Sequence, residues 1–240
     1  MSYLEAVIRS LKLVSSFRKI AKHPPDIESK FYHSLRKITE ECVVREDFIM
    51  TLSRDKRVLH FGFLDSPFAQ EGILSGSLLH QKVKKVADYL HGIDIDASSL
   101  EIYRNLTGDT DNSILDIEGD IEGVDVLSKG YQIILFPEIL EHLLAPARAL
   151  TNLKRVCCLN EGAKLCITVP NAFSILGFYT AMDGIELVHP DHYYYFSPFT
   201  LRKLLNDTGF SKVDLKLYSS ADLVRSPGIT KHGVIAICDV

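Results

Sequence analysis

The chain has 240 residues, which is enough for one full-sized domain with a helical extension but cramped for two complete domains. Hydrophobic residues make up 46% of the chain and charged residues 24%, as in ordinary soluble globular proteins, and no apolar run approaches the roughly 18–20 residues that span a bilayer. The sequence therefore predicts no integral membrane contact, and the net charge of −4 argues against broad attraction to nucleic acid.

The sequence predicts a cytoplasmic protein with reduced cysteines. Residues 1–26 lack the continuous apolar stretch and the small-residue cleavage pattern of a secretory signal. The five cysteines show no C-x-x-C spacing, and an odd number cannot form a complete disulfide framework. We therefore expect core thiols, because Cys166 and Cys238 lie inside strand-like runs.

Residues 1–54 predict an N-terminal helical extension. Apolar side chains fall near one helical face over residues 1–22, and a second helical pattern covers about 27–52, after the helix-ending "HPPD" of 23–26. The first helix is basic, which fits a membrane-surface role, although packing on the domain or on a second subunit is the simpler interpretation. The extension either covers a substrate entrance or mediates a homodimer, and the residues do not decide between the two.

From residue 55 to residue 240 the chain predicts an α/β domain. Short apolar runs alternate with helix-like segments, which is typical of a parallel sheet flanked by helices. The expected strands are 57–61, 90–94, 114–118, 131–136 and 163–169, and the expected helices are about 76–89, 97–106, 139–158 and 198–208. Two late strands, "KVDLKLY" and "GVIAICDV", have no good helix between them, so we expect an antiparallel hairpin at one edge.

Three residues at or after strand ends are candidates for binding a nucleotide-type ligand, because ligands of open α/β sheets lie beyond the carboxyl ends of the strands. Gly62 follows the first strand and lets the backbone approach a bound group closely. Asp94 ends the second strand, where a carboxylate can accept hydrogen bonds from both hydroxyls of a ribose. Asp120 can receive the amine of an adenine while Ile121 packs on the ring, but Asp120 also fits an ordinary exposed acid.

Further candidates follow the later strands. Glu138, Glu141 and His142 stand at i, i+3 and i+4, so they share one face if a helix starts there. The three tyrosines of "HPDHYYYFS" either line a substrate pocket or alternate between core and solvent.

These stretches together resemble the class I S-adenosylmethionine-dependent methyltransferases over about residues 55–240. The most specific parts are "GIDID", "GDIE", "EILEHL" and "HPDHYYYFSPFTLRKLLNDTGF". The last is similar to a stretch of methyltransferases often associated with O-methylation of small molecules and sugars. The resemblance implies a Rossmann-like fold with a seven-stranded, mostly parallel sheet whose last strand is antiparallel, and S-adenosylmethionine as cofactor.

The first strand departs from the family pattern of an acid followed by three alternating glycines. His60 replaces the acid, and only Gly62 remains of the glycines. A subgroup of the family carries a similar histidine and glycine with an aspartate three residues later, which matches His60, Gly62 and Asp65. The resemblance therefore implies a variant cofactor loop, in which Asp65 or His60 contacts the methionine end of the cofactor. A degenerate loop that no longer binds cofactor is the alternative.

Methyl transfer to a hydroxyl needs a group that helps the proton to leave. The candidate catalytic residues are His142 and Glu138. The E-x-x-E-H run also resembles the metal site of the small-RNA 2′-O-methyltransferases, and ubiquinone-pathway O-methyltransferases share it. That resemblance implies Mg²⁺ or a similar ion on Glu138, Glu141, His142 and one of His189 or His192, with His192 favoured. In the alternative, His142 is a metal-free base or a structural hydrogen-bonding group.

The sequence as a whole predicts an S-adenosylmethionine-dependent methyltransferase that acts on the oxygen of a small molecule or sugar-type hydroxyl and binds no nucleic acid. An RNA 2′-O-methyltransferase should show a basic surface, which the net charge of −4 does not provide. A non-catalytic S-adenosylmethionine-binding subunit is an alternative that would explain the missing glycines. An NAD-dependent oxidoreductase is disfavoured, because no G-x-G-x-x-G follows the first strand.

Overall fold

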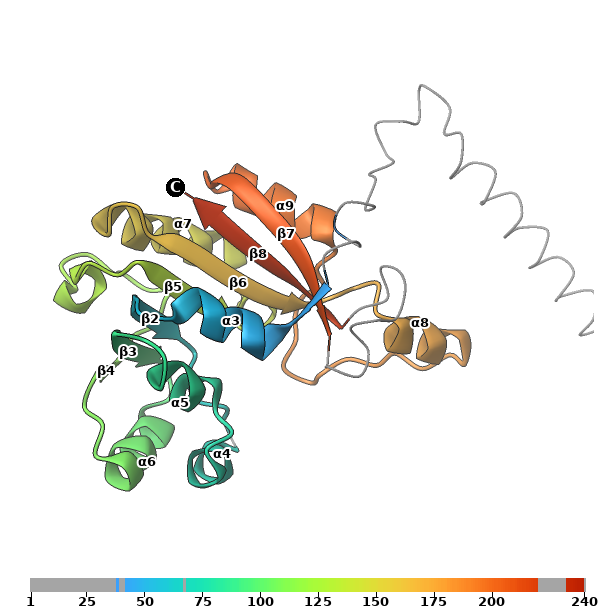
Figure 1. Ribbon diagram of the computed structural model, residues 1–240. Helices are drawn as coiled ribbons and strands as arrows, with labels where there is room; N and C mark the ends of the chain where they lie inside the picture. The colour runs from blue at the N-terminus through green and yellow to red at the C-terminus, as the bar shows by residue number, and fades with distance from the viewer. Residues whose placement is uncertain (1–37, 39–41, 67, 220–231, 240) are drawn as a thin grey trace, which may run out of the picture. The chain divides into compact units, whose positions relative to one another are not determined.

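Figure 1 shows the computed structural model of the chain, which describes residue 38 and residues 42–66, 68–219 and 232–239. The helix expected over 1–22 lies outside the described residues, as does most of the helix expected over 27–52. The last part of that second segment is strand β1 (Cys42–Val44) followed by helix α3 (Arg45–Ser53). The division of the chain between residues 54 and 55 stays a prediction.

One mixed sheet forms the centre of the described unit. Its eight strands lie in the order β1-β7-β8-β6-β5-β2-β3-β4. The strands after β1 are β2 (Arg57–Phe61), β3 (Tyr89–Asp94), β4 (Asn112–Ile114), β5 (Ile133–Pro137), β6 (Lys164–Pro170), β7 (Ser211–Ser219) and β8 (Gly233–Asp239). Only β8 runs antiparallel to its neighbours, β6 and β7. This confirms the predicted Rossmann-like α/β class, and the sheet has one strand more than expected because β1 pairs with β7.

The central strands form where the sequence is mostly apolar, with His60 as a buried polar residue inside β2. Every residue of β5 is buried, and four of the five residues of β2 are buried. Parallel strands covered by helices on both faces require such runs. Helices α3 and α5 (Leu79–Lys84) cover one face, where Ile49 and Val83 pack into a core cluster with Val58 and Leu135. In Figure 1, α7 (Pro146–Leu159) and α9 (Pro198–Asp207) lie behind the sheet, on the face opposite α3.

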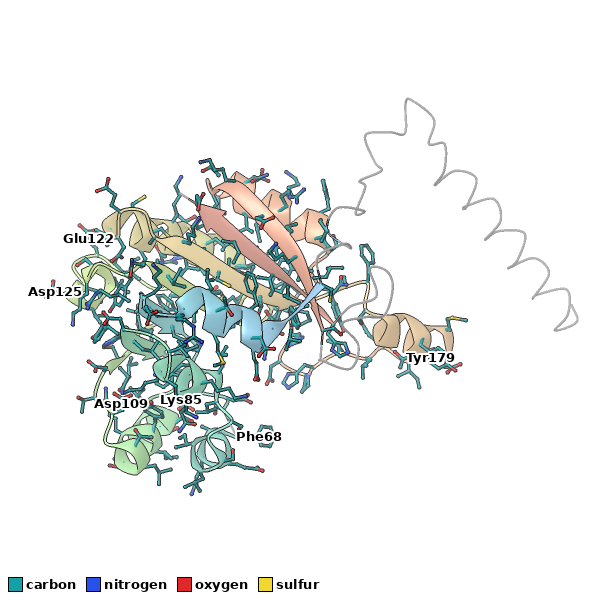
Figure 2. All side chains as sticks on the ribbon, in the orientation of Figure 1. Phe68, Lys85, Asp109, Glu122, Asp125 and Tyr179 are labelled. Atoms are coloured by element: carbon teal, nitrogen blue, oxygen red, sulfur yellow. The ribbon has the colours of Figure 1, made fainter. Side chains whose placement is uncertain are left out.

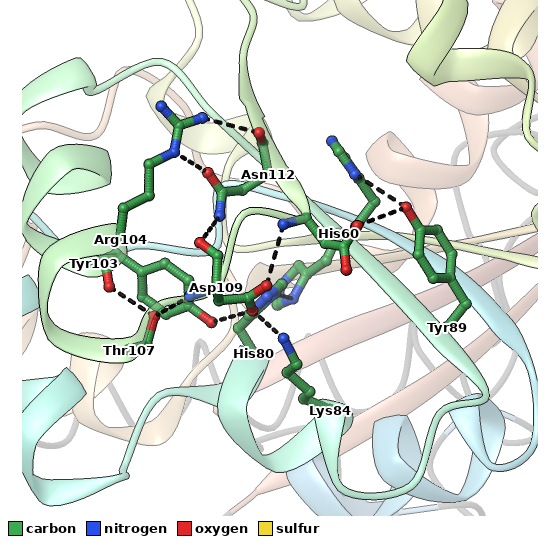
Figure 3. A network of polar contacts seen from close by, with 11 residues as sticks. His60, His80, Lys84, Tyr89, Tyr103, Arg104, Thr107, Asp109 and Asn112 are labelled. Carbon is green, nitrogen blue, oxygen red and sulfur yellow. Dashed lines mark hydrogen bonds and ion pairs between the residues drawn. The ribbon is translucent and has the colours of Figure 1, made fainter.

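The strand expected over 114–118 is wrong, because β4 ends at Ile114. Asp116 begins a turn there: its Oδ1 accepts the Glu118 N–H at 2.8 Å, and its carbonyl accepts the Gly119 N–H at 3.0 Å. The strand pairs with β3, and α6 (Ala97–Thr107) holds it further, since Arg104 Nε donates to Asn112 Oδ1 at 2.6 Å (Figure 3).

Two of the expected helices are interrupted. Within the segment 76–89 the structure has one short helix, α5. Gly76 adopts a left-handed conformation with φ 70° and ends the preceding helix, α4 (Ala69–Ser75), so no helix starts at residue 76. The segment 139–158 begins with a short 3₁₀ turn at Leu140–His142, and α7 starts only at Pro146. Proline suits the first turn of a helix and disfavours helical backbone in the residue before it.

Helices α6 and α9 confirm the ranges expected for them. Asp96 caps α6, since its side chain accepts hydrogen bonds from Ser98 N and Ser99 N. Helix α8 (Ile175–Met182) lies in the segment between β6 and α9. Among the described residues, no helix has both the length and the apolar character needed to cross a membrane.

Candidate functional site

The sheet order contains one switch point, between β2 and β5. Strand β2 pairs with β3 on one side and with β5 on the other, so the strand order reverses between β2 and β5. Ligands of doubly wound sheets bind at such a switch point, beyond the carboxyl ends of the strands. Gly62, Asp94 and Glu138 stand at the carboxyl ends of β2, β3 and β5. The structure therefore brings these three predicted site residues to one edge of the sheet.

Gly62 is a position where no other residue fits without strain. Its φ is +59°, and its N–H donates to the Ile93 carbonyl at 2.7 Å. A Cβ at this position would lie 2.6 Å from Cδ1 of Ile139. The one glycine retained from the family pattern therefore lets the β2 loop turn close under the segment that follows β5.

Asp94 ties this loop to the end of β3. Its side chain is buried, its Oδ2 accepts the Leu64 N–H at 2.9 Å, and its Oδ1 accepts the Asp96 N–H at 3.1 Å. Burial raises the pKa of Asp94, and the backbone hydrogen bonds oppose that rise. Each carboxylate oxygen has two lone pairs, so both can still accept a ribose hydroxyl. Ribose binding by Asp94 stays a prediction that this geometry fits.

His60 lies inside the core beneath the loop. Its side chain is 1% exposed, and its Nδ1 is 3.3 Å from Nδ1 of His80, with the two rings stacked at 5.3 Å (Figure 3). Burial, and then the charge of Arg45, lowers the pKa of His60 to about 3, and burial also lowers the pKa of His80. Both rings are neutral at pH 7. Sequence reasoning missed His80, because nothing in its local pattern marks it as a partner of His60.

The remaining cofactor candidates lie in two loops. Asp65 is exposed in the loop after β2. Asp120 is also exposed, and its Oδ1 accepts the Glu122 N–H at 3.0 Å. The side chain of Ile121 is buried. Contacts of these three residues with a cofactor stay predictions.

Glu138, Glu141 and His142 do not share an α-helical face, which corrects the sequence-based expectation. Glu138 has a left-handed backbone with φ 51°, and its N–H donates to the Thr168 carbonyl at 2.8 Å. Leu140–His142 form a single 3₁₀ turn, and Leu143 is extended. The chain therefore changes direction at Glu138, and the three residues are not related by the repeat of an α-helix.

Glu138 is held by three surrounding elements. Its Oε1 accepts hydrogen bonds from Thr168 Oγ1 at 2.6 Å and from the Tyr218 hydroxyl at 2.9 Å. Arg45 of α3 places a guanidinium nitrogen 3.7 Å from the same oxygen. Burial, and then the charge of Glu138, raises the pKa of Tyr218, which keeps its hydroxyl protonated as a donor. The Glu138 carboxylate is thus fixed in position and still partly open to solvent, at 29% exposure.

Glu141 is fully buried, and neither of its carboxyl oxygens has a hydrogen-bond partner among the described residues. Burial, and then the neighbouring Glu138, raises the pKa of Glu141 to about 9. The backbone carbonyl of Glu141 accepts the N–H groups of Tyr193 at 2.8 Å and Tyr194 at 3.3 Å. These bonds tie the segment after His192 to the 3₁₀ turn that carries His142.

Three histidines meet at this junction. One ring nitrogen from each of His142, His189 and His192 lies within 4.8 Å of the others. The ring centroids of His142 and His192 are 4.5 Å apart, and those of His189 and His192 are 5.1 Å apart. Burial, and then the charges of the other two rings, lowers the pKa of His192. The structure therefore brings His142 and His192 together as predicted, adds His189, and leaves both glutamate carboxylates outside this group.

A hollow of about 540 Å³ opens beside the carboxyl end of β6. The residues that line it include Asn171, Ser174, Ile185, Leu187 and Tyr195. The lining mixes apolar and polar groups, which is typical of small-molecule sites.

The fold defines a class of protein: a Rossmann-like α/β domain with a switch point in its sheet between β2 and β5. The chain belongs to a family described as methyltransferase domain, whose model matches residues 47–215. It is accordingly an S-adenosylmethionine-dependent methyltransferase. The residues present fit that cofactor, because the Asp94 carboxylate at the end of β3 retains acceptor capacity for ribose hydroxyls.

Solved structures share the fold. A SAM-dependent methyltransferase from Archaeoglobus fulgidus matches with TM-score 0.52 and 16% identity, covering 88% of this chain and 97% of that one. A methyltransferase from Thermotoga maritima matches with TM-score 0.55 and 15% identity, covering 88% and 95%. The small RNA methyltransferase HEN1 matches with TM-score 0.57 and 15% identity, covering 81% of this chain but 24% of that one. A search of curated protein sequences found no match.

Proposed function

We propose that this enzyme methylates a hydroxyl oxygen of a small molecule. The observation that carries the proposal is the Glu138 carboxylate, which is held at the carboxyl end of β5 by Thr168 and Tyr218 and stays partly exposed. A hydroxyl must lose its proton as its oxygen attacks, so an O-methyltransferase benefits from a fixed acceptor at this place. Glu138 and His142 are the two groups that can take this role.

Methyl transfer depends mainly on the alignment of the reacting atoms. S-adenosylmethionine supplies an electrophilic methyl group on a positively charged sulfur. The chain holds the substrate oxygen in line with the methyl carbon and the sulfur. The hydroxyl proton passes to Glu138 or His142, the oxygen forms its bond to the methyl carbon, and the electron pair of the carbon–sulfur bond stays on the sulfur. Glu138 is well suited, because the two donors on its Oε1 orient its other oxygen.

The surroundings of the hollow support a small molecule with an apolar part. More than half of the large apolar side chains that are exposed among the described residues lie in 173–199. Tyr179 projects from α8 (Figure 2), and Met182, Ile185 and Leu187 are exposed in the same segment. Apolar side chains gathered near a reactive centre favour a ligand that buries them. An RNA substrate would instead need a concentration of basic side chains.

The test is to incubate the full-length protein with methyl-tritiated S-adenosylmethionine and separate classes of acceptor. The panel contains phenols, aliphatic alcohols, sugars, primary amines and a short RNA. We expect label on a small-molecule hydroxyl. Label only on an amine or on RNA ribose would contradict the proposal, and cofactor binding with no transfer to any class would favour the non-catalytic subunit.

A matched pair of variants tests the role of Glu138. In Glu138→Gln, the amide oxygen still accepts from Thr168 and Tyr218, but the side chain cannot take a proton. We expect kcat to fall by about a hundredfold or more, with little change in KM. Glu101→Gln alters an exposed acid on α6 and should leave kcat unchanged. Full activity of Glu138→Gln would remove Glu138 as the proton acceptor.

A homodimer and a cytoplasmic location stay predictions. Size-exclusion chromatography with light scattering on the full chain tests the first, and fractionation of cells with an antibody to the chain tests the second.

A further inference from the structure

We propose that His142, His189 and His192 form a binding site for a divalent transition-metal ion of the Zn²⁺ type, with a coordination position left open toward the substrate. The three side chains supply nitrogen ligands only. The binding of the ion depends on these residues alone, whereas its part in activating a substrate hydroxyl rests on the proposed function.

The spacing of the rings fits one ion. Zn²⁺ binds histidine nitrogen at about 2.0–2.1 Å, so two ligands in tetrahedral geometry lie about 3.4 Å apart. The three nitrogens already lie within 4.8 Å of one another. His189 is exposed, and His142 and His192 are partly exposed. Rotation of side chains is therefore enough to close the rings on an ion, and the backbone need not move.

The backbone around the rings is fixed without an ion. Residues 189–192 form a turn that is closed by the hydrogen bond from His192 N to His189 O at 3.0 Å. Pro190 restricts the backbone at the second position of this turn. The next residue, Tyr193, donates its N–H to the Glu141 carbonyl at 2.8 Å. Two segments that are far apart in the sequence are thus joined so that all three rings meet.

The ligand type distinguishes this site from the predicted Mg²⁺ site. Mg²⁺ prefers oxygen ligands in octahedral geometry, whereas three imidazoles with one open position are typical of catalytic Zn²⁺ sites. The carboxylates of Glu138 and Glu141 do not belong to the group of converging ligand atoms. Asp191 places a carboxylate oxygen 3.8 Å from Nδ1 of His189, where it supplies a negative charge beside the rings.

The site also assigns separate tasks to the two catalytic candidates. With His142 bound to the ion, Glu138 remains as the group that accepts the substrate proton. If the attacking hydroxyl occupies the open coordination position, the ion would lower its pKa, as metal ions do in other enzymes. The balance of the reaction is unchanged, because the proton goes to Glu138 and the carbon–sulfur electron pair stays on sulfur.

The first experiment measures metal binding on the full-length protein. The protein carries Cys158→Ser, because Cys158 is an exposed thiol that would also bind Zn²⁺. After dialysis against a chelator and then against buffer, the protein is titrated calorimetrically with ZnCl₂ and with MgCl₂. We expect one Zn²⁺ per chain and at least a hundredfold weaker response to Mg²⁺. Absence of Zn²⁺ binding, or equal binding of both ions, would overturn the proposal.

A set of variants locates the ion. Separate alanine substitutions at His142, His189 and His192 should each weaken Zn²⁺ binding by about a hundredfold or more, and Asp191→Asn should weaken it less. His232→Ala changes an exposed histidine outside the group and should leave binding unchanged. Thermal unfolding of each variant shows whether it is folded. Co²⁺ in place of Zn²⁺ gives a visible spectrum of a four-coordinate site, and loss of that spectrum in folded variants is expected. Unchanged binding in all three alanine variants would refute the site.

The same preparations separate this inference from the proposed function. If Zn²⁺ binds at the histidines but no hydroxyl is methylated, the proposed function fails and the metal site stands. If a hydroxyl is methylated at full rate by the chelator-treated protein, the role of the ion in activating the hydroxyl fails and the proposed function stands.

Discussion

Alanine in place of Gly62 should destabilise the protein through two effects of the added Cβ. With φ at +59°, a residue with a side chain costs about 1–2 kcal/mol relative to glycine. The Cβ would also lie 2.6 Å from Ile139 Cδ1 and 2.7 Å from its Cγ1, well inside normal contact distance. Such overpacking costs typically about 1–3 kcal/mol. We therefore expect Gly62→Ala to lower the free energy of unfolding by about 2–5 kcal/mol.

The two effects can be separated by urea unfolding followed by circular dichroism. In an Ile139→Ala background the overlap is removed, so adding Gly62→Ala should cost only about 1–2 kcal/mol. Gly108→Ala is the matched control, because its φ is +69° and a Cβ there meets no atom within 4 Å. That control also shares the loss of unfolded-chain entropy that any glycine-to-alanine change brings.

The result that would refute this reasoning is a cost of Gly62→Ala equal to that of Gly108→Ala. An equal cost of Gly62→Ala in the presence and absence of the Ile139 side chain would lead to the same conclusion. Either outcome would show that the β2 loop does not pass close under Ile139.

Three further predictions concern the cofactor site and the core. Asp94→Ala should weaken S-adenosylmethionine binding by at least a hundredfold in calorimetry, because the ribose acceptor is lost while the fold remains. Asp96→Ala should lower the free energy of unfolding by about 1 kcal/mol, because it removes the cap of α6. The protein should lose stability as the pH falls below 6.5, because the neutral buried ring of His60, with a pKa of about 3, takes up its proton only on unfolding. From pH 6.5 to pH 5 this residue alone removes about 2 kcal/mol.

Each of these predictions has a control. For Asp94, near-ultraviolet circular dichroism shows whether the variant is folded, and unchanged cofactor affinity would remove the ribose assignment. For Asp96, substitution by asparagine should restore most of the stability, since asparagine also caps helices. For the pH effect, His60→Gln should make the loss of stability between pH 6.5 and pH 5 shallower, while the buried His80 ring retains its own share, and an equally steep fall in that variant would show that His60 does not contribute.

The sequence predicted the central part of the fold because local and long-range forces agree there. The ranges 57–61 and 198–208 match β2 and α9 closely, since a mostly apolar run and a serine cap define them locally. Strand β1 was not predicted. It has only three residues and exists through its pairing with β7, more than 170 positions later in the chain. No local pattern reports such a partner.

The candidate site could be predicted as a set of residues but not as a geometry. The strand-end positions of Gly62, Asp94 and Glu138 followed from the alternation of strands and helices. The left-handed backbone of Glu138 was not visible, because a glutamate with positive φ is held by tertiary contacts and not by its own preference. Pro146 was the available signal that the helix starts later than expected. The grouping of His189 with His142 depends on the turn at Pro190 and on the bonds of Glu141.

The central claim is that adenosine binds beyond β2 and β3 with its ribose on Asp94. A crystal structure of the full chain grown with saturating S-adenosylhomocysteine tests it most directly. We expect the ribose hydroxyls within about 2.6–3.2 Å of the Asp94 carboxylate and the sulfur directed toward Glu138. A filled site elsewhere, or a cleft closed by side chains with no ligand in it, would contradict the account.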